Sequence, residues 1–127
     1  PPQLAAMMNS YLLAAIGGAL GSVARYGLYR AFPGHGFALV TLSVNVGGSF
    51  LIGILAAIPL LRGGPWGALL MTGVLGGFTT FSTFSLDVMT LWVRGQIVPM
   101  LLYVAVSIFL SLAAVFAGHA IGREVFA

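Results

Sequence analysis

Four long apolar segments joined by very short connectors are the feature that most constrains the fold of this chain. A helix needs about 20 mostly apolar residues to cross the hydrocarbon core of a bilayer. The sequence predicts four such spans, at residues 10–31, 36–61, 66–93 and 97–122. Because the connectors are too short to hold a separate folded unit, we expect one all-α integral membrane domain over residues 1–127.

The composition excludes the soluble and disordered classes of protein. Hydrophobic residues make up 60% of the chain and charged residues only 6%, whereas ordinary soluble domains carry roughly 25% charged residues. The basic residues are five scattered arginines, and a nucleic-acid surface needs clustered basic side chains, so we expect no nucleic-acid partner. The chain has no cysteine, which excludes a disulfide framework and a thiolate metal site.

The arginines near the span ends are divided evenly between the two sides of the predicted bundle. Arg62 and Arg123 lie on the side of the N-terminus, and Arg30 and Arg94 lie on the other side. The excess of basic residues that normally fixes the orientation of a membrane protein is therefore missing. Either a single further charge decides the orientation, or the chain inserts both ways round and pairs as an antiparallel dimer.

The third segment departs from an ordinary membrane helix. Trp66 and Trp92 suit interface anchors, but a continuous helix would separate them by about 39 Å, more than the roughly 30 Å hydrocarbon core. Between them, a Gly pair precedes a cluster of Ser and Thr, and these residue types weaken helices. We expect a helix break near residues 76–80, buried at an interface because lipid does not tolerate free backbone groups. Freed carbonyls at such a break can hold a cation.

Two rows of uncharged polar residues run along the predicted spans, each with a spacing of four that puts its members on one helix face. The second span carries Thr41, Asn45 and Ser49, and the fourth span carries Tyr103, Ser107 and Ser111. Such side chains commonly hold neighbouring membrane helices together. Two aligned rows with an Asn at mid-span suit a polar path through the membrane at least as well.

The predicted spans contain hydrogen-bond donors but almost no acids. Phe81 and Phe84 share a helix face, and although such residues usually pack, their ring edges carry positive potential that can face an anion. Arg25 either extends its side chain to the interface or attracts anions in a vestibule. Asp87 is the single acid inside the spans. This set of groups favours a small anion that sheds its water.

Three other functions fit less well. A small multidrug exporter needs an acid inside the membrane for proton coupling, and the first span offers only Arg25. A scaffold subunit would explain the GxxxG pattern of Gly17 and Gly21, which is typical of close helix packing, but not the hydroxyl-rich third span. An enzyme is the weakest candidate, because no set of nucleophile, base and orienting group can be assembled.

Three motifs together resemble the Fluc (CrcB) family of fluoride channels over essentially the whole chain. They are GGFTTFSTFS at residues 76–85, VNVGG at residues 44–48 and GxxxxxxR ending at Arg25, and the row of Tyr103, Ser107 and Ser111 downstream also fits the family. The resemblance implies a passive fluoride-selective channel, a multi-pass protein of the cell membrane (inner or plasma) that exports fluoride and confers fluoride resistance. It also implies an antiparallel, dual-topology homodimer, with the third helix broken mid-membrane and two pores that are each built from both subunits.

The same resemblance assigns the pore. The residues that match it, with two neighbouring hydroxyls that we expect on the same path, are Asn45, Phe81, Phe84, Thr41, Tyr103, Ser107, Ser111, Thr80, Ser82 and, in a vestibule, Arg25. Each pore is implied to take one of its two phenylalanines from each subunit. The dehydrated anion would then pass along amide and hydroxyl donors and the edges of the aromatic rings.

A structural sodium ion (Na+) at the dimer centre is also implied by the resemblance. The backbone carbonyls of Gly76 and Thr79, one on each side of the expected break, would hold it in each chain. Asp87 departs from the family pattern, which often has Glu at this position, so the side chain here is one methylene shorter.

Overall fold

The computed structural model describes residues 2–33 and 36–126, which are almost entirely helical. The elements in chain order are α1 (Pro2–Ala31), α2 (Phe37–Ala56), the 3-10 helix η2 (Pro59–Leu61), α3 (Pro65–Gly67), the π-helix η3 (Ala68–Leu75), α4 (Gly76–Phe78), α5 (Phe81–Val93) and α6 (Ile97–Phe126). Four helical stretches are long and apolar enough to cross a membrane, the third being the composite Pro65–Val93. The predicted all-α architecture with four membrane-spanning helices is confirmed.

The helix bounds differ from the expected spans at three ends. Helix α1 begins at Pro2 and α6 continues to Phe126, so both extend beyond the expected apolar cores. Helix α2 ends at Ala56, whereas the second span was expected to continue to residue 61. The reason is Pro59, which has no N–H to donate and clashes with the preceding turn, so the chain leaves the α-helix and forms η2.

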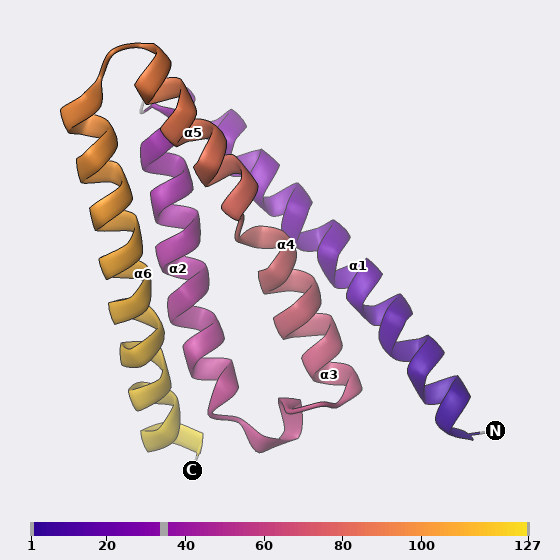
Figure 1. Cartoon of the computed structure of the whole chain (residues 1–127). Coiled ribbons are helices and arrows are strands. Elements are labelled where there is room, and N and C mark those ends of the chain that lie inside the picture. Colours follow the sequence, from indigo (N-terminus) through magenta and orange to yellow (C-terminus); the bar gives the residue numbers. More distant parts are fainter. Residues whose placement is uncertain (1, 34–35, 127) are drawn as a thin grey trace.

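Helices α2 and α6 lie side by side along most of their length (Figure 1). Glycines make this approach possible, since a Cβ at Gly53 would lie 2.2 Å from the Val115 carbonyl oxygen. A Cβ at Gly118 would likewise lie 2.1 Å from the Phe50 carbonyl oxygen. Two backbones this close gain dispersion contacts along a long seam, which is the usual way for membrane helices to associate.

Helix α1 crosses the third stretch in the same manner. A Cβ at Gly17 would lie 2.2 Å from the Leu69 carbonyl oxygen, and one at Gly21 would lie 2.0 Å from that of Val74. The close packing expected for this GxxxG pattern is therefore confirmed. This packing fixes α1 against η3 and α4, which form the first part of the third stretch.

The connection from α5 to α6 is a short reversal that returns the chain across the bundle. The Gly95 N–H donates to the Trp92 carbonyl (3.0 Å) and the Gln96 N–H to the Leu91 carbonyl (2.9 Å). This pair of bonds is a Schellman motif, whose central residue needs the left-handed conformation that Gly95 adopts at φ 73°. The N- and C-terminal ends of the chain consequently lie on the same side of the bundle (Figure 1).

The third stretch changes its helical type along its length. A π-helix covers Ala68–Leu75, one α-helical turn follows at Gly76–Phe78, and α5 begins only at Phe81. Thr79 and Thr80 between them are extended, with ψ 156° and ψ 126°, so the axis of the stretch is offset there (Figure 1). The position of this junction at the middle of a membrane stays a prediction.

Candidate functional site

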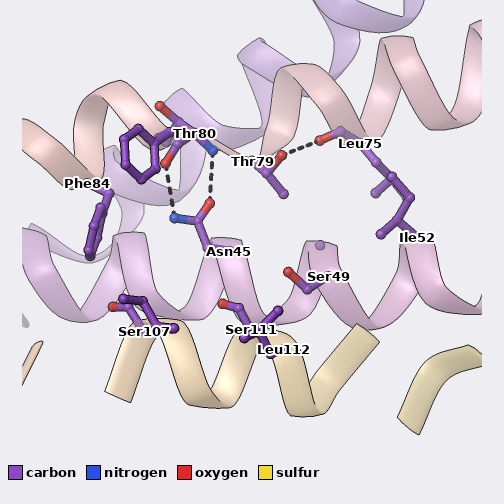
Figure 2. Close-up of a pocket in the computed structure, with 13 residues that line it drawn as sticks. Asn45, Ser49, Ile52, Leu75, Thr79, Thr80, Phe84, Ser107, Ser111 and Leu112 are labelled. Carbon is purple, nitrogen blue, oxygen red and sulfur yellow. Dashed lines mark hydrogen bonds between the residues drawn. The ribbon is translucent and has the colours of Figure 1, made fainter. Parts of the chain in front are cut away.

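A cavity of about 410 Å³ lies where α2, α6 and the junction between α4 and α5 meet. Figure 2 shows its lining, with Asn45, Ser49 and Ile52 on one side, Ser107, Ser111 and Leu112 below them, and the threonine pair opposite. Six of the expected pore residues contribute to it, namely Asn45, Thr80, Phe81, Phe84, Ser107 and Ser111. Residues from the expected polar rows of two helices thus face one hollow together with the junction.

Asn45 holds the extended junction in place. Its Nδ2 donates to the Thr80 carbonyl (3.0 Å), and the Thr80 N–H donates to its Oδ1 (2.9 Å), as Figure 2 shows. Oδ1 thereby takes the place of the Gly76 carbonyl as the acceptor for the Thr80 N–H, so this backbone group stays paired although the helix is interrupted. One Nδ2 hydrogen is left over for another acceptor. Sequence reasoning identified Asn45 as a donor but did not anticipate this backbone pairing.

Thr80 also starts helix α5. Its Oγ1 accepts from the Thr83 N–H (3.1 Å), which is the usual bond of an N-cap residue. The same oxygen donates to Thr83 Oγ1 (3.2 Å) and lies 3.3 Å from Ser82 Oγ. The N-terminus of α5, whose free N–H groups favour negative charge, therefore adjoins the cavity.

Three aromatic rings form a row at one end of the cavity. The ring centroids of Phe81 and Phe84 are 5.6 Å apart, and those of Phe84 and Tyr103 are 5.2 Å apart. The rings are tilted at 42° and 45°, so each presents an edge as well as a face. Phe81 is 78% exposed in the single chain, which leaves a large apolar surface beside the cavity.

Ser107 has the most informative side chain of the site. It is 7% exposed and lines the cavity. Its hydroxyl has no hydrogen-bond partner, and among the described residues it is the one buried side-chain polar atom in this condition. A buried polar group without a partner costs about 1–3 kcal/mol. A ligand that accepts a hydrogen bond in the cavity would recover this energy.

Four expected pore residues lie outside the cavity. Thr41 and Tyr103 are buried beside it, where the Tyr103 hydroxyl donates to Asp87 Oδ2 (2.9 Å) and the Thr41 hydroxyl meets that of Tyr29. Ser82 is exposed at the start of α5, and Arg25 belongs to α1. Tyr29 was not singled out by sequence reasoning, because no spacing rule connects it to a residue on another helix.

Arg25 lies next to the junction rather than at a helix end. Its Nε donates to the Gly77 carbonyl at 3.3 Å. This bond satisfies one backbone oxygen of α4 and fixes the guanidinium group beside the offset in the third stretch. The role of Arg25 in a vestibule stays a prediction.

The backbone oxygens of the junction suit a cation. The Thr80 N–H donates to Asn45, so the Gly76 carbonyl lacks the donor that a continuous helix would supply four residues later. Thr79 has left the helical conformation, which turns its carbonyl away from the helix axis. Carbonyl oxygens can replace the hydration shell of an alkali cation. No cluster of three or more His, Asp or Glu suited to a metal occurs in residues 2–33 and 36–126.

Comparisons with known proteins give a consistent result. Residues 12–119 match the family model described as CrcB-like protein, Camphor Resistance (CrcB). A protein of Paracoccus denitrificans (strain Pd 1222) named "Fluoride-specific ion channel FluC" is 55% identical over 126 residues, covering 95% of this chain and 100% of that protein. Proteins of the same name from Cereibacter sphaeroides (strain ATCC 17029 / ATH 2.4.9) and Agrobacterium fabrum are 50% and 46% identical, over 92% and 94% of this chain and 97% and 100% of their own lengths.

Proposed function

The chain belongs to the CrcB-like family, and from this premise we propose that it is a passive, fluoride-selective channel. It is a multi-pass membrane protein and a channel rather than an enzyme. The observation that carries the proposal is the buried, unpartnered hydroxyl of Ser107 in the cavity. A hydroxyl left free in this position is suited to an acceptor that arrives and leaves, as a conducted anion does.

The mechanism that we propose follows from the small size of fluoride. A compact anion is strongly hydrated, so its entry into a narrow path requires donors that replace its water at short range. The Ser107 hydroxyl is a free donor, Ser111 lies one helical turn further, and the N-terminus of α5 adds positive potential. The tilted rings of Phe81 and Phe84 present edges to the same space. Neutral dipoles bind weakly enough to release the ion.

The functional unit that we propose is an antiparallel, dual-topology homodimer with two pores. The exposed Phe81 ring and the exposed Gly76 backbone would be covered by a second copy of the chain. The even distribution of arginines supports insertion in both orientations. In this arrangement the junction at Thr79 and Thr80 lies mid-membrane, and each pore takes one of its two Phe rings from each subunit.

A structural Na+ at the dimer centre is part of the proposal. The Gly76 and Thr79 carbonyls of each chain would hold it, and the ion would offset the repulsion between carbonyl dipoles that meet there. The lost helical donor of Gly76 supports this assignment. The cell-membrane location and the role in fluoride resistance that we propose follow from outward fluoride movement through such a channel.

Efflux from liposomes tests the function directly. The purified protein is reconstituted, and fluoride and chloride efflux are compared under equal gradients and with protein-free liposomes as the control. Rapid fluoride efflux with little chloride efflux is the expected result. A correctly folded protein that releases neither anion, or both equally, would contradict the proposal.

A further inference from the structure

Four side chains, one from each membrane-spanning stretch, form a cluster beside the cavity, in which three are buried and Tyr29 is half-buried. They are Tyr29 of α1, Thr41 of α2, Asp87 of α5 and Tyr103 of α6. The exposed fractions of Thr41, Asp87 and Tyr103 are 0%, 4% and 8%. The cluster adjoins the cavity through the contact between the Tyr103 and Phe84 rings, whose centroids are 5.2 Å apart. An anion that moves from Ser107 toward the Phe84 ring therefore approaches the cluster.

Every hydroxyl hydrogen of the cluster can be accounted for within the protein. The Thr41 hydroxyl donates to the Phe37 carbonyl (3.1 Å), and the Tyr103 hydroxyl donates to Asp87 Oδ2 (2.9 Å). Since a hydroxyl has a single hydrogen, Tyr29 is then the donor in its bond with Thr41. These four described side chains therefore keep no donor for an anion, in contrast with the free hydroxyl of Ser107.

Thr41 could act as a donor only if its hydroxyl turned away from the Phe37 carbonyl. The bond from Tyr29 opposes this rotation, because it occupies a lone pair of Thr41 Oγ1 and fixes the position of the oxygen. The phenol oxygen is the only polar atom in the Tyr29 side chain. Its removal would leave the bonds from Thr41 to Phe37 and from Tyr103 to Asp87 intact.

We propose that Tyr29 is a positioning residue that holds the Thr41 hydroxyl in its inward bond and so closes this end of the anion path. Conduction then requires that the bond between Tyr29 and Thr41 opens while an ion passes. This inference rests on the proposed fluoride channel function, and it adds a rate-limiting contact that involves α1, a helix otherwise absent from the cavity lining.

The first test is the fluoride efflux rate of Tyr29→Phe in liposomes. The variant keeps the ring and removes the hydroxyl, so we expect efflux to become about fivefold faster, the factor that corresponds to one ordinary hydrogen bond. Tyr26→Phe is the matched control on the same helix, because Tyr26 is exposed and its hydroxyl accepts from Arg30 Nη1 (3.4 Å), away from the cluster. An unchanged or slower efflux in Tyr29→Phe would overturn the inference.

The second test repeats the substitution in chains that carry a change at Thr41. In a Thr41→Val background, Tyr29→Phe is expected to have no effect, because the bond that it removes is already gone. In a Thr41→Ser background, which retains the hydroxyl, the acceleration is expected to persist. If Tyr29→Phe accelerates efflux fivefold even in the Thr41→Val background, Tyr29 acts through its packing and the inference is wrong.

Fluoride efflux by the unsubstituted protein in the same liposomes distinguishes a failure of the proposed channel function from a failure of the role assigned to Tyr29. If it conducts fluoride and Tyr29→Phe conducts at the same rate, only the role of Tyr29 is refuted. If the unsubstituted protein conducts no fluoride, the proposed function fails and the inference fails with it. Elution of each variant as the same species in gel filtration identifies any substitution that has disturbed folding.

Discussion

The third and fourth membrane-spanning stretches use their hydroxyl groups in opposite ways. In the third stretch, Thr79 Oγ1 donates to the Leu75 carbonyl (2.9 Å), Thr80 caps α5, and Ser85 Oγ donates to the Phe81 carbonyl (3.0 Å). In the fourth, α6 is one continuous helix of 30 residues whose buried Ser107 hydroxyl has no partner. The interrupted stretch directs these hydroxyls to its own backbone, whereas the continuous helix leaves the Ser107 hydroxyl for a ligand.

This comparison separates structural polar groups from functional ones. Substitutions at the junction should reduce stability and conduction together, because the bonds there hold the backbone. Substitution of the free hydroxyl should reduce conduction alone. Three substitutions at or beside the junction test this distinction. We expect the largest effect at Asn45, a smaller effect at Gly76 and the smallest effect at Thr80.

Asn45→Asp is expected to have the largest effect. The carboxylate loses the donor to the Thr80 carbonyl and repels that oxygen, so we expect a loss of about 3 kcal/mol in the free energy of unfolding. Fluoride efflux should be abolished, because the added negative charge also repels the anion. Denaturant unfolding in detergent and liposome efflux measure the two effects. Asn9→Asp introduces the same charge at an exposed position of α1 and is the control. If the Asn45→Asp protein is stable and conducts fluoride, Asn45 does not have the structural role proposed for it at the junction.

Gly76→Val is expected to act between chains rather than within one. A Cβ at Gly76 would meet only the Met71 carbonyl oxygen, at an ordinary 3.6 Å. A bulky side chain at a dimer centre should weaken association by about 2 kcal/mol, or roughly 30-fold. The monomer–dimer ratio in lipid, measured by single-molecule photobleaching, checks this expectation. Gly18→Val, at a position whose Cβ meets nothing within 4 Å, is the control. An unchanged dimer would argue against an interface at the junction.

Thr80→Ala should have the smallest effect of the three. It removes the N-cap of α5 but leaves the backbone of residue 80 free to pair with Asn45. We expect a loss of about 1 kcal/mol in the free energy of unfolding and a moderate reduction in efflux. Thr90→Ala, which removes a hydroxyl bonded to the Leu86 carbonyl within the same helix, serves as the comparison in denaturant unfolding. Equal stability of Thr80→Ala and the unsubstituted protein would refute the capping role.

The four helices could be predicted because apolar length is a local property of the sequence. The packing at Gly17 and Gly21 could be predicted for the same reason, since a spacing of four selects one helix face. The end of α2 was missed because the apolar run to residue 61 concealed the effect of Pro59. The π-helix at Ala68–Leu75 also went unforeseen, since no residue pattern in the chain distinguishes it from an α-helix.

The candidate site was predictable in its residue types but not in its bonds. The cavity gathers six expected pore residues because the two polar rows lie on helix faces that meet. The pairing of Asn45 with Thr80 connects residues 35 positions apart, and the contact between Tyr29 and Thr41 depends on how α1 crosses α2. Whether a hydroxyl such as that of Ser107 finds a partner is decided by tertiary packing, which local spacing does not encode.

The most direct test of the central claim is the fluoride efflux of Ser107→Ala, measured together with its unfolding free energy. Ser107 has no bond to lose and its unpaired hydroxyl is itself costly to bury, so the free energy of unfolding should stay the same or rise, while efflux should fall at least about tenfold because a bond to a charged ion disappears. Ser85→Ala, which removes an exposed hydroxyl from α5, should conduct normally. If Ser107→Ala conducts fluoride as fast as the unsubstituted protein, the free hydroxyl is not part of the anion path and the account is wrong.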